Sequence, residues 1–412
     1  MSLVLGTATE EGAALDWVRL LSEEVGPRRP TGPAERRAAE LVADRLARGG
    51  LKVEQRPFSG YATFALPYGA ALGVALVGVA FARRRPWLAS ALAAAGATLT
   101  AAEDGMVHRP LTRLLARRPS RNVVATIEPS GEPERTVCLV CHLDSSRSGL
   151  IFHRRFLPLL QPWIALHSAS FAITVAGPLL RRARLGRKVL AAAYAILIAN
   201  LGLLAERELR GVDVPGANDN ASGVAAVGTL AAELNERPLS STRVVCLFTG
   251  CEEALVLGAQ AFLKDLGSAS QPLPNDLGSP QSREPGAQEL HSWVFLNFDG
   301  VAAPATLRYL RREGAARKWP ADAHLVRIAS EVAQRHPELG LEGTDHNAGL
   351  TYDSTPVMAH GGRAITFSTQ DRIIPNYHSP TDRVENTDPS VLERAIEVGR
   401  QMLAAIDRGE AD

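Results

Sequence analysis

Cysteine is scarce in this chain, which has four among 412 residues: Cys138, Cys141, Cys246 and Cys251. All four lie in apolar runs typical of central strands, where free thiols commonly pack as small hydrophobic groups. A zinc knuckle at Cys138 and Cys141 is disfavoured, because two residues three positions apart on an extended strand point to opposite faces. The sequence therefore predicts four thiols in the core.

The chain also lacks a strong charge of either sign and a recognisable export signal. Lys plus Arg total 45 and Asp plus Glu total 44, so nothing favours a nucleic-acid partner. The N-terminal stretch MSLVLGTATEEGAALDW has no basic region followed by an apolar run, as a cleavable signal peptide would. We therefore expect the protein on the cytoplasmic side of the membrane.

The length predicts one large domain with sizeable insertions, or two domains. Short apolar runs predict strands at 51–58, 122–127, 136–140, 243–249, 292–298 and 364–368. Helical patterns alternate with them at 13–25, 33–48, 221–234, 254–266, 322–336 and 389–406. This alternation predicts an α/β fold with a mixed, mostly parallel central sheet and helices on both faces. Residues 267–288, rich in Ser, Pro, Gly and Gln, are expected to form a surface loop.

Two stretches depart from this pattern, and each joins two apolar segments by an arginine-rich turn. The segments are 64–82 with 87–102, and 156–180 with 189–205. We expect apolar helical hairpins inserted at 61–105 and 155–206, and a main domain made of 1–60, 106–154 and 207–412.

Two interpretations of these hairpins remain open. Apolar segments near 20 residues approach the length that crosses a bilayer, and hairpins would give the even number of crossings that the main domain requires. Alternatively, they form a helical subdomain that packs on the sheet or in an oligomer interface. Lys and Arg on the two sides balance, so charge gives no orientation.

Polar motifs follow the apolar runs at five places: CLVCHLDSS, PGANDNASG, CLFTGCEEALVLGA, FLNFDG and NYHSPTD. Each alone has a structural explanation, such as a polar loop, a helix cap at Asp219, or a helix dipole beside Glu252 and Glu253. Coincidence at all five is much less probable, because carboxyl ends of strands are where α/β proteins assemble their sites.

The residue types in these motifs suit two zinc ions, which need imidazoles, carboxylates and one bridging carboxylate. The set that supplies them is His142, Asp219, Glu253, Asp299 and His378. Asp144 remains free to accept the other ring proton of His142 and fix its tautomer. Glu252 remains free to take a proton from water and pass it to a leaving amine.

The order HLD, ANDNASG, CEE, NFDG and YHSPTD resembles that of the co-catalytic zinc aminopeptidases, peptidase family M28, over roughly 10–60 and 119–408. The resemblance implies the zinc exopeptidase fold, with His142 and Asp299 on one zinc and Asp219 bridging to a second zinc. Glu253 and His378 would bind that second zinc.

The resemblance also implies roles for residues that bind no metal. Glu252 would be the general base, Asp144 the orienting partner of His142, and Tyr377 a donor to the developing oxyanion. Asp353 opens the stretch YDSTPVMAHGGRAITF, which resembles the segment that shapes the substrate pocket.

The implied activity is that of an aminopeptidase acting on peptides with a free N-terminus. The alternatives are a carboxypeptidase-like hydrolase, a glutaminyl cyclase, or a non-catalytic, membrane-associated interaction protein. The full ligand set favours hydrolysis, since cyclases of the family use one zinc and non-catalytic relatives lose ligands. The second hairpin leaves the sheet close to His142, so it either roofs the pocket or brings the site near a membrane; oligomerisation stays open.

Overall fold

The computed structural model describes residues 10–269, 287–346, 349–371 and 373–411. An eight-stranded sheet lies at the centre of the protein. The strand order is β1-β2-β4-β3-β5-β10-β6-β9. The strands are β1 (Lys52–Gly60), β2 (Arg118–Ile127), β3 (Arg135–His142), β4 (Thr242–Thr249), β5 (Trp293–Phe298), β6 (Leu307–Leu310), β9 (Glu342–Thr344) and β10 (Arg363–Thr369). A separate pair is formed by β7 (Arg312–Glu313) and β8 (Trp319–Pro320).

The four central strands β4, β3, β5 and β10 are parallel, while β2 and β6 run antiparallel to their central neighbours. Their apolar runs are buried on both faces, as expected for parallel strands covered by helices. The α/β prediction is therefore confirmed. The short strands β6 and β9 were not predicted from the sequence.

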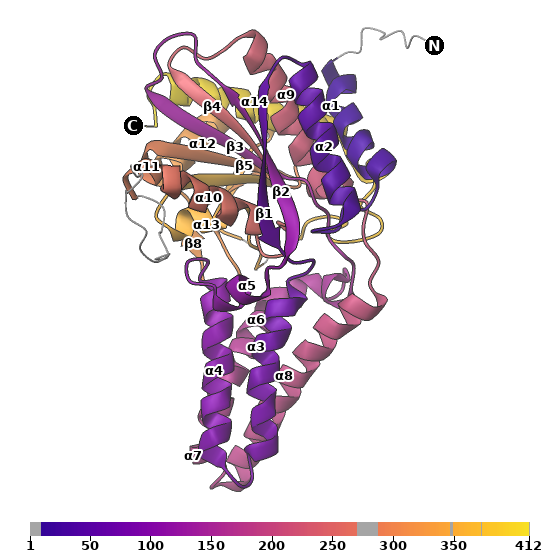
Figure 1. Ribbon diagram of the computed structural model, residues 1–412, viewed down its shortest axis with the longest axis vertical. Coiled ribbons are helices and arrows are strands. Elements are labelled where there is room, and N and C mark those ends of the chain that lie inside the picture. The colour runs from indigo at the N-terminus through magenta and orange to yellow at the C-terminus, as the bar shows by residue number, and fades with distance from the viewer. Residues whose placement is uncertain (1–9, 270–286, 347–348, 372, 412) are drawn as a thin grey trace, which may run out of the picture.

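Two groups of helices cover the sheet (Figure 1). The first group is α1 (Glu10–Arg19), α2 (Pro33–Arg48), α9 (Gly223–Glu236), α12 (Ala323–Arg335) and α14 (Pro389–Asp407). The second is α10 (Leu257–Ala269), α11 (Ala287–Ser292) and α13 (Thr355–Ala359). Short helical turns lie at Leu20–Val25, Leu150–Phe152, Leu157–Leu159, Ala217–Ser222, Pro337–Leu339 and Val384–Asn386. Most of the loop expected at 267–288 lies outside the described residues.

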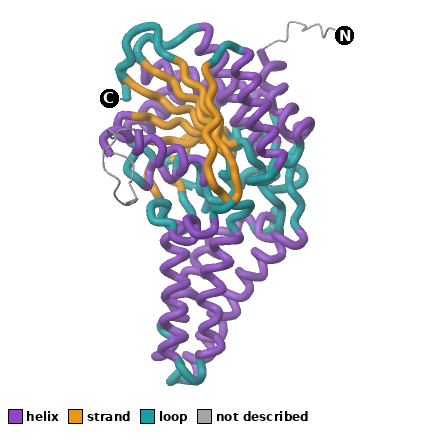
Figure 2. Tube along the Cα trace, viewed as in Figure 1, coloured by secondary structure: helices purple, strands orange, loops and turns teal. Residues whose placement is uncertain are grey.

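A helical subdomain projects from one end of the sheet (Figures 1 and 2). It consists of α3 (Ala65–Phe81), α4 (Pro86–Asp104), α6 (Leu160–Val175), α7 (Gly177–Leu180) and α8 (Arg184–Arg210), with α5 (Pro110–Leu115) at the junction. The helix α3 packs against α4 and α8, and α6 packs against the same two helices. Both apolar stretches are thus helical, whereas their status as insertions stays a prediction.

The subdomain lies beside the carboxyl ends of the central strands. β1 runs in the same direction as β4, because each is antiparallel to β2. It ends at Gly60, shortly before α3 begins at Ala65. Loops that leave β3, β4, β5 and β10 therefore open toward the helices.

The cysteine prediction is confirmed for burial, since all four thiols are free and buried. Cys138 and Cys141 lie in β3 and Cys246 in β4. The strand placement was wrong for Cys251. β4 ends at Thr249, and Cys251 takes a left-handed backbone conformation with φ of 55° in the following loop.

A fully buried guanidinium connects the N-terminal segment to two loops at this edge of the sheet. Arg28 donates hydrogen bonds to the backbone carbonyl oxygens of Leu21 (2.8 Å), Gly26 (3.0 Å), Leu143 (2.8 Å), Pro215 (2.7 Å) and Gly216 (2.9 Å). Burial lowers the pKa of Arg28 to about 10, and the nearby carboxylates of Asp382 and Asp144 oppose this shift. The side chain therefore stays cationic at neutral pH.

Replacing Arg28 by Met should lower the free energy of unfolding by about 3 kcal/mol, because several buried carbonyl groups would lose their donor. Urea denaturation measures the change. Arg36→Met, on the exposed side of α2, is the matched control and should unfold at nearly the wild-type urea concentration. Equal midpoints for both variants would contradict a structural role for the buried guanidinium.

Candidate functional site

The polar motifs meet at the carboxyl edge of the sheet. His142 ends β3, Glu252 and Glu253 lie between β4 and α10, and Asp299 directly follows β5. Two further residues of the predicted set come from loops: Asp219 precedes α9, and His378 lies between β10 and α14. All of these side chains are buried.

Two groups of ligand-type atoms form there, and Asp219 belongs to both. In the first, His142 Nε2 lies 3.1 Å from Asp219 Oδ1 and 3.5 Å from Asp299 Oδ2. In the second, His378 Nε2 lies 3.3 Å from Asp219 Oδ2 and 3.2 Å from Glu253 Oε2. Within each group the ligand atoms lie within 4.8 Å of one another. The two oxygens of one carboxylate thus face two adjacent sites.

The chemistry of these groups fits divalent cations. His142 Nε2, Glu253 Oε1 and His378 Nδ1 are buried and make no hydrogen bond of good geometry among the described residues. Asp219, Glu253 and Asp299 also bring more negative charge into a buried space than two imidazoles can balance. Buried charge without compensation is costly, and zinc binds the same nitrogen and carboxylate donors. The structure therefore contains two buried candidate metal sites.

The pKa values of the cluster show the same need for positive charge. Burial raises the pKa of Asp299 to about 6 and that of Glu252 well above its usual value. Burial lowers the pKa of His378, but the carboxylates of Glu253 and Asp219 outweigh it and raise this pKa to about 9. Protons thus neutralise the metal-free cluster, and cation binding would release them.

Asp144 connects the first motif to the pair of glutamates. Its carboxylate accepts hydrogen bonds from the backbone N–H groups of Glu252 (3.1 Å) and Glu253 (3.0 Å). The same carboxylate lies 3.7 Å from His142 Nδ1, whereas the backbone oxygen of Asp144 lies 3.1 Å from that nitrogen. The closer acceptor for the ring proton of His142 is therefore the main chain of Asp144.

Asp382 fixes the segment that carries Asp219, a role that was not predicted from the sequence although the residue lies in the last motif. Its carboxylate accepts hydrogen bonds from the backbone N–H groups of Asn218 (2.7 Å) and Asp219 (3.0 Å). The helix cap is supplied by Asn220, whose Oδ1 accepts from the N–H of Gly223 at 2.9 Å. Asp219 is thus available for ligands.

The loop that carries Glu252 and Glu253 has an unusual backbone. Cys251, Leu255 and Val256 adopt left-handed conformations with φ of 55°, 70° and 51°. Such values are rare for branched side chains and cluster at functional sites. They also explain why α10 starts at Leu257 and not at 254 as expected.

A buried glutamate that was not predicted from the sequence supports this loop. Glu35 Oε1 accepts from the N–H of Cys251 at 2.8 Å. Its Oε2 accepts from the N–H of Thr31 at 2.8 Å and from Ser120 Oγ at 3.0 Å. Its position in the first turn of α2 is common for glutamate, so the sequence carried no signal for this role.

The two remaining predicted residues, Tyr377 and Asp353, have different surroundings. Tyr377 stacks on the ring of His378 with centroids 3.7 Å apart, and Phe152 packs edge-on to that ring at 4.2 Å. Asp353 is buried and accepts a hydrogen bond from Thr249 Oγ1. Tyr377 lines the adjoining cavity, and Asp353 does not.

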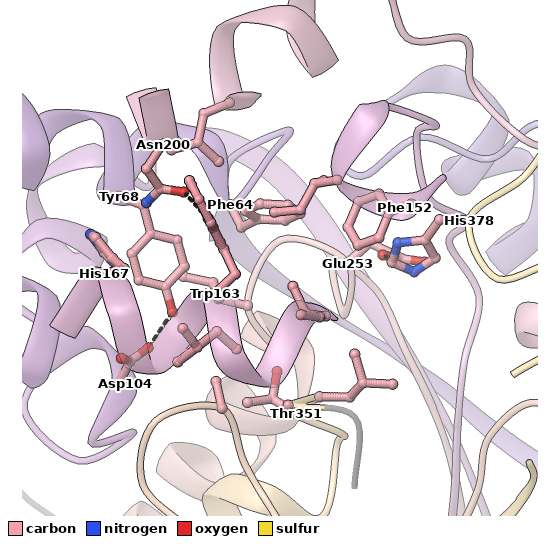
Figure 3. Close-up of a pocket in the computed structure, with 18 of the residues that line it drawn as sticks. Phe64, Tyr68, Asp104, Phe152, Trp163, His167, Asn200, Glu253, Thr351 and His378 are labelled. Carbon is pink, nitrogen blue, oxygen red and sulfur yellow. Dashed lines mark hydrogen bonds and ion pairs between the residues drawn. The ribbon is translucent and has the colours of Figure 1, made fainter. Parts of the chain in front are cut away.

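A cavity of about 190 Å³ joins the cluster to the helical subdomain (Figure 3). Glu252, Glu253 and His378 line one end. Residues of the subdomain helices line the other end, namely Tyr68, Thr100, Asp104, Leu160, Trp163, Ile164, His167, Asn200 and Leu204. Both predicted hairpins thus contribute to the space in front of the cluster.

An α/β sheet with two carboxylate–imidazole groups that share one aspartate is the architecture of a two-metal site. Peptidase family M28 is the family whose model matches the chain, over residues 202–403. This range contains all the residues of the two groups except His142. Residues 202–403, about half of the chain, belong to this family.

Solved structures show the same fold. A zinc aminopeptidase from Bacillus subtilis has a TM-score of 0.55 and 15% identity, over 97% of this chain and 96% of that chain. An aminopeptidase from Aneurinibacillus sp. strain AM-1 has a TM-score of 0.53 and 15% identity, over 96% and 93%. A glutaminyl cyclase from Bacteroides thetaiotaomicron has a TM-score of 0.50 and 13% identity, over 96% and 97%. A search of the curated proteins finds no match.

Metal analysis of variants tests the shared role of Asp219. Asp219→Ala should lose both zinc ions, because its carboxylate belongs to both groups, whereas Asp299→Ala should lose about one. Elemental analysis after dialysis gives the metal content per chain. Asp44→Ala, on the exposed side of α2, should keep the wild-type content. Wild-type zinc content in Asp219→Ala would contradict the assignment.

Proposed function

We propose that the protein is a two-zinc aminopeptidase that removes residues from the free N-terminus of peptides. The observation that carries the proposal is the position of Asp219 between two imidazole-containing groups, with Glu252 beside them at one end of a cavity. The assignment of zinc rests on the nitrogen and carboxylate donors and on the family.

Glu252 is suited to proton transfer. Its Oε2 lies 3.9 Å from His142 Nε2, and its side chain lines the cavity without belonging to either candidate metal group. Burial raises the pKa of this carboxyl group in the metal-free protein, and bound cations would release its proton and leave a carboxylate that can accept one from water. We assign it the removal of a proton from the attacking water and its delivery to the leaving amine.

Two zinc ions, when bound, would supply the activation of water and the polarisation of the scissile carbonyl group. Tyr377 lies beside His378 on the cavity wall, and we assign its hydroxyl group as a donor to the oxygen that becomes negative. The carboxylates at this end of the cavity also favour the positively charged amine of an unblocked peptide.

A panel of three substrates separates this activity from its rivals. An unblocked peptide, its N-acetylated form and a peptide with N-terminal glutamine are incubated with the zinc-loaded protein. We expect cleavage of the first bond in the two peptides with a free N-terminus, and no cleavage of the N-acetylated form. Cleavage of the blocked peptide from its other end would indicate a carboxypeptidase-like hydrolase, and ammonia release without cleavage a glutaminyl cyclase.

Glu252→Gln should keep two zinc ions per chain and lower kcat by about 10²–10⁴-fold, since the amide cannot accept the proton. Glu385→Gln, an exposed change near the loop of His378, is the control and should keep wild-type kcat. Initial rates at saturating substrate and elemental analysis of the same samples give both quantities. A Glu252→Gln variant with full rate would exclude the assigned role.

We further propose that the helical subdomain inserts into a lipid bilayer. Large hydrophobic side chains that are exposed among the described residues all lie between 66 and 212, including Val77, Trp87, Leu185 and Ile198 at 54–72% exposure. Small residues fill the contact between α3 and α4, where a Cβ at Gly96 would lie 2.6 Å from the carbonyl oxygen of Ala71. Small residues inside and large apolar residues outside are typical of membrane bundles.

Length and charge support the same proposal. Within the described chain, α8, with 27 residues, is the helix that is long and apolar enough to cross a membrane. Its most apolar stretch of 18 residues has a mean hydropathy of 1.9, and 28% of that stretch is buried. A core helix of a soluble protein would be mostly buried. The far end of the subdomain carries Arg83, Arg84, Arg85, Arg181, Arg182, Arg184, Arg187 and Lys188, and neither 61–102 nor 145–205 contains Asp or Glu. Such a basic end complements anionic headgroups.

Vesicle flotation tests the bilayer proposal. Wild-type protein should float with vesicles of phosphatidylcholine and phosphatidylglycerol after a high-salt wash, and Ile198→Asp should greatly reduce this binding, because a charge would enter the hydrocarbon. Leu209 is an exposed residue at the end of the same helix that lies beside the sheet, and the Leu209→Asp variant should still float with the vesicles. A wild-type protein that stays in solution as an oligomer, with these side chains in its interface, would contradict the proposal.

A further inference from the structure

The cavity in front of the candidate metal groups has two chemically different ends. One end presents Glu252, Glu253 and His378, where the proposed reaction takes place. The opposite end lies among α3, α4, α6 and α8, and Figure 3 shows Tyr68, Asp104 and Asn200 there, across the open space from Glu253 and His378. A substrate that reacts at the first end can therefore extend a side chain toward the second.

The wall between the two ends is apolar. It is formed by Phe64, Ile151, Phe152, Leu160, Ile164, Leu204, Leu255 and Leu350. With about 190 Å³, the cavity exceeds the ~150 Å³ of apolar space that binds a benzene molecule in an engineered protein. The space thus suits a large apolar group.

Polar groups at the deep end are largely paired with one another. The hydroxyl group of Tyr68 donates to Asp104 Oδ1, and Trp163 Nε1 donates to Asn200 Oδ1 at 3.1 Å. A buried polar group that already has a hydrogen-bond partner in the protein does not require one from a ligand. A basic side chain is nevertheless the competing ligand, because Asp104 and His167 also lie at this end. The experiment below therefore includes a lysyl reporter.

The deep end is also fixed relative to the reacting end. Arg109 donates to Glu103 Oε2 at 3.1 Å and to the backbone oxygen of Leu255 at 2.8 Å, and both side chains are buried. Glu103 belongs to α4, and Leu255 belongs to the loop of Glu252 and Glu253. This ion pair therefore connects a subdomain helix directly to the loop that carries the proposed general base.

We propose that this cavity is a specificity site for the N-terminal side chain of the substrate, and that it selects a long apolar side chain. The inference rests on the proposed aminopeptidase activity and adds the substrate class. The helical subdomain supplies the deep end through Thr100 of α4 and Trp163 and Ile164 of α6, so it acts as a part of the substrate site as well as an attachment surface.

Aminoacyl reporters of increasing side-chain length test the site. For alanyl, 2-aminobutyryl, norleucyl and 2-aminooctanoyl reporters, kcat/KM should rise by about fourfold per added methylene while each new group is buried. A lysyl reporter should be hydrolysed more slowly than the norleucyl one. A lysyl preference that disappears in Asp104→Asn, or equal rates along the apolar series, would overturn the proposal.

Matched tryptophan substitutions locate the deep end. Thr100→Trp fills the cavity from α4, and the neighbouring Ala101→Trp places the same side chain on the exposed side of that helix. The ratio of kcat/KM for 2-aminooctanoyl over alanyl reporters should fall by about tenfold in Thr100→Trp and stay unchanged in Ala101→Trp. Equal ratios in both variants would overturn the assignment of Thr100.

The same comparison on a second helix covers the case in which one variant fails to fold. Ile164→Trp fills the cavity from α6, and Ala165→Trp is its exposed neighbour. Ile164→Trp should lower the ratio by about tenfold, while Ala165→Trp should leave it at the wild-type value. Unaltered ratios in both cavity variants would exclude the cavity as the specificity site.

A binding measurement separates failure of this proposal from failure of the proposed function. Calorimetry with 2-aminooctanoic acid and the Glu252→Gln protein reports binding without turnover. Binding that is weakened by Thr100→Trp and kept by Ala101→Trp supports the site even if no reporter is hydrolysed. Hydrolysis of the reporters without such binding would support the aminopeptidase and reject the site.

Discussion

The arrangement depends on one carboxylate that two imidazoles approach from opposite sides. His142 ends a central strand, His378 lies in a loop far along the chain, and both face the oxygens of Asp219 at 3.1 and 3.3 Å. The three segments that carry these side chains must therefore be positioned relative to one another for both groups to form. Much of the polar core serves this placement.

The supporting groups are buried carboxylates that accept hydrogen bonds from backbone N–H groups of the ligand-bearing loops. Asp382 binds the N–H of Asp219, Asp144 binds those of Glu252 and Glu253, and Glu35 binds that of Cys251. Carboxylates in these positions have fixed partners with few alternatives, unlike flexible surface ion pairs. The ligands other than His142 thus lie in loops whose main chain is held by buried side chains.

The sequence allowed a good prediction of the helices and strands that depend on a local pattern of residues. Continuous apolar runs predicted the central strands, and the helical pattern at 33–48 predicted α2 with its observed limits. It did not reveal β6 and β9, which are only four and three residues long. Nor did it reveal Glu35 or Arg28 as supports, because their partners are main-chain atoms remote in the sequence. The strand assignment of Cys251 failed because the backbone turns left-handed after β4.

The helical subdomain adds two features to the site. Its helices carry apolar side chains outward and, at the base, contribute the deep end of the cavity. The central claim remains the shared aspartate. Anomalous diffraction near the zinc edge, from crystals of the zinc-loaded protein, tests it most directly. Two peaks about 3.5–4 Å apart, one on each side of Asp219, are expected; a single peak, or peaks away from this carboxylate, would contradict the account.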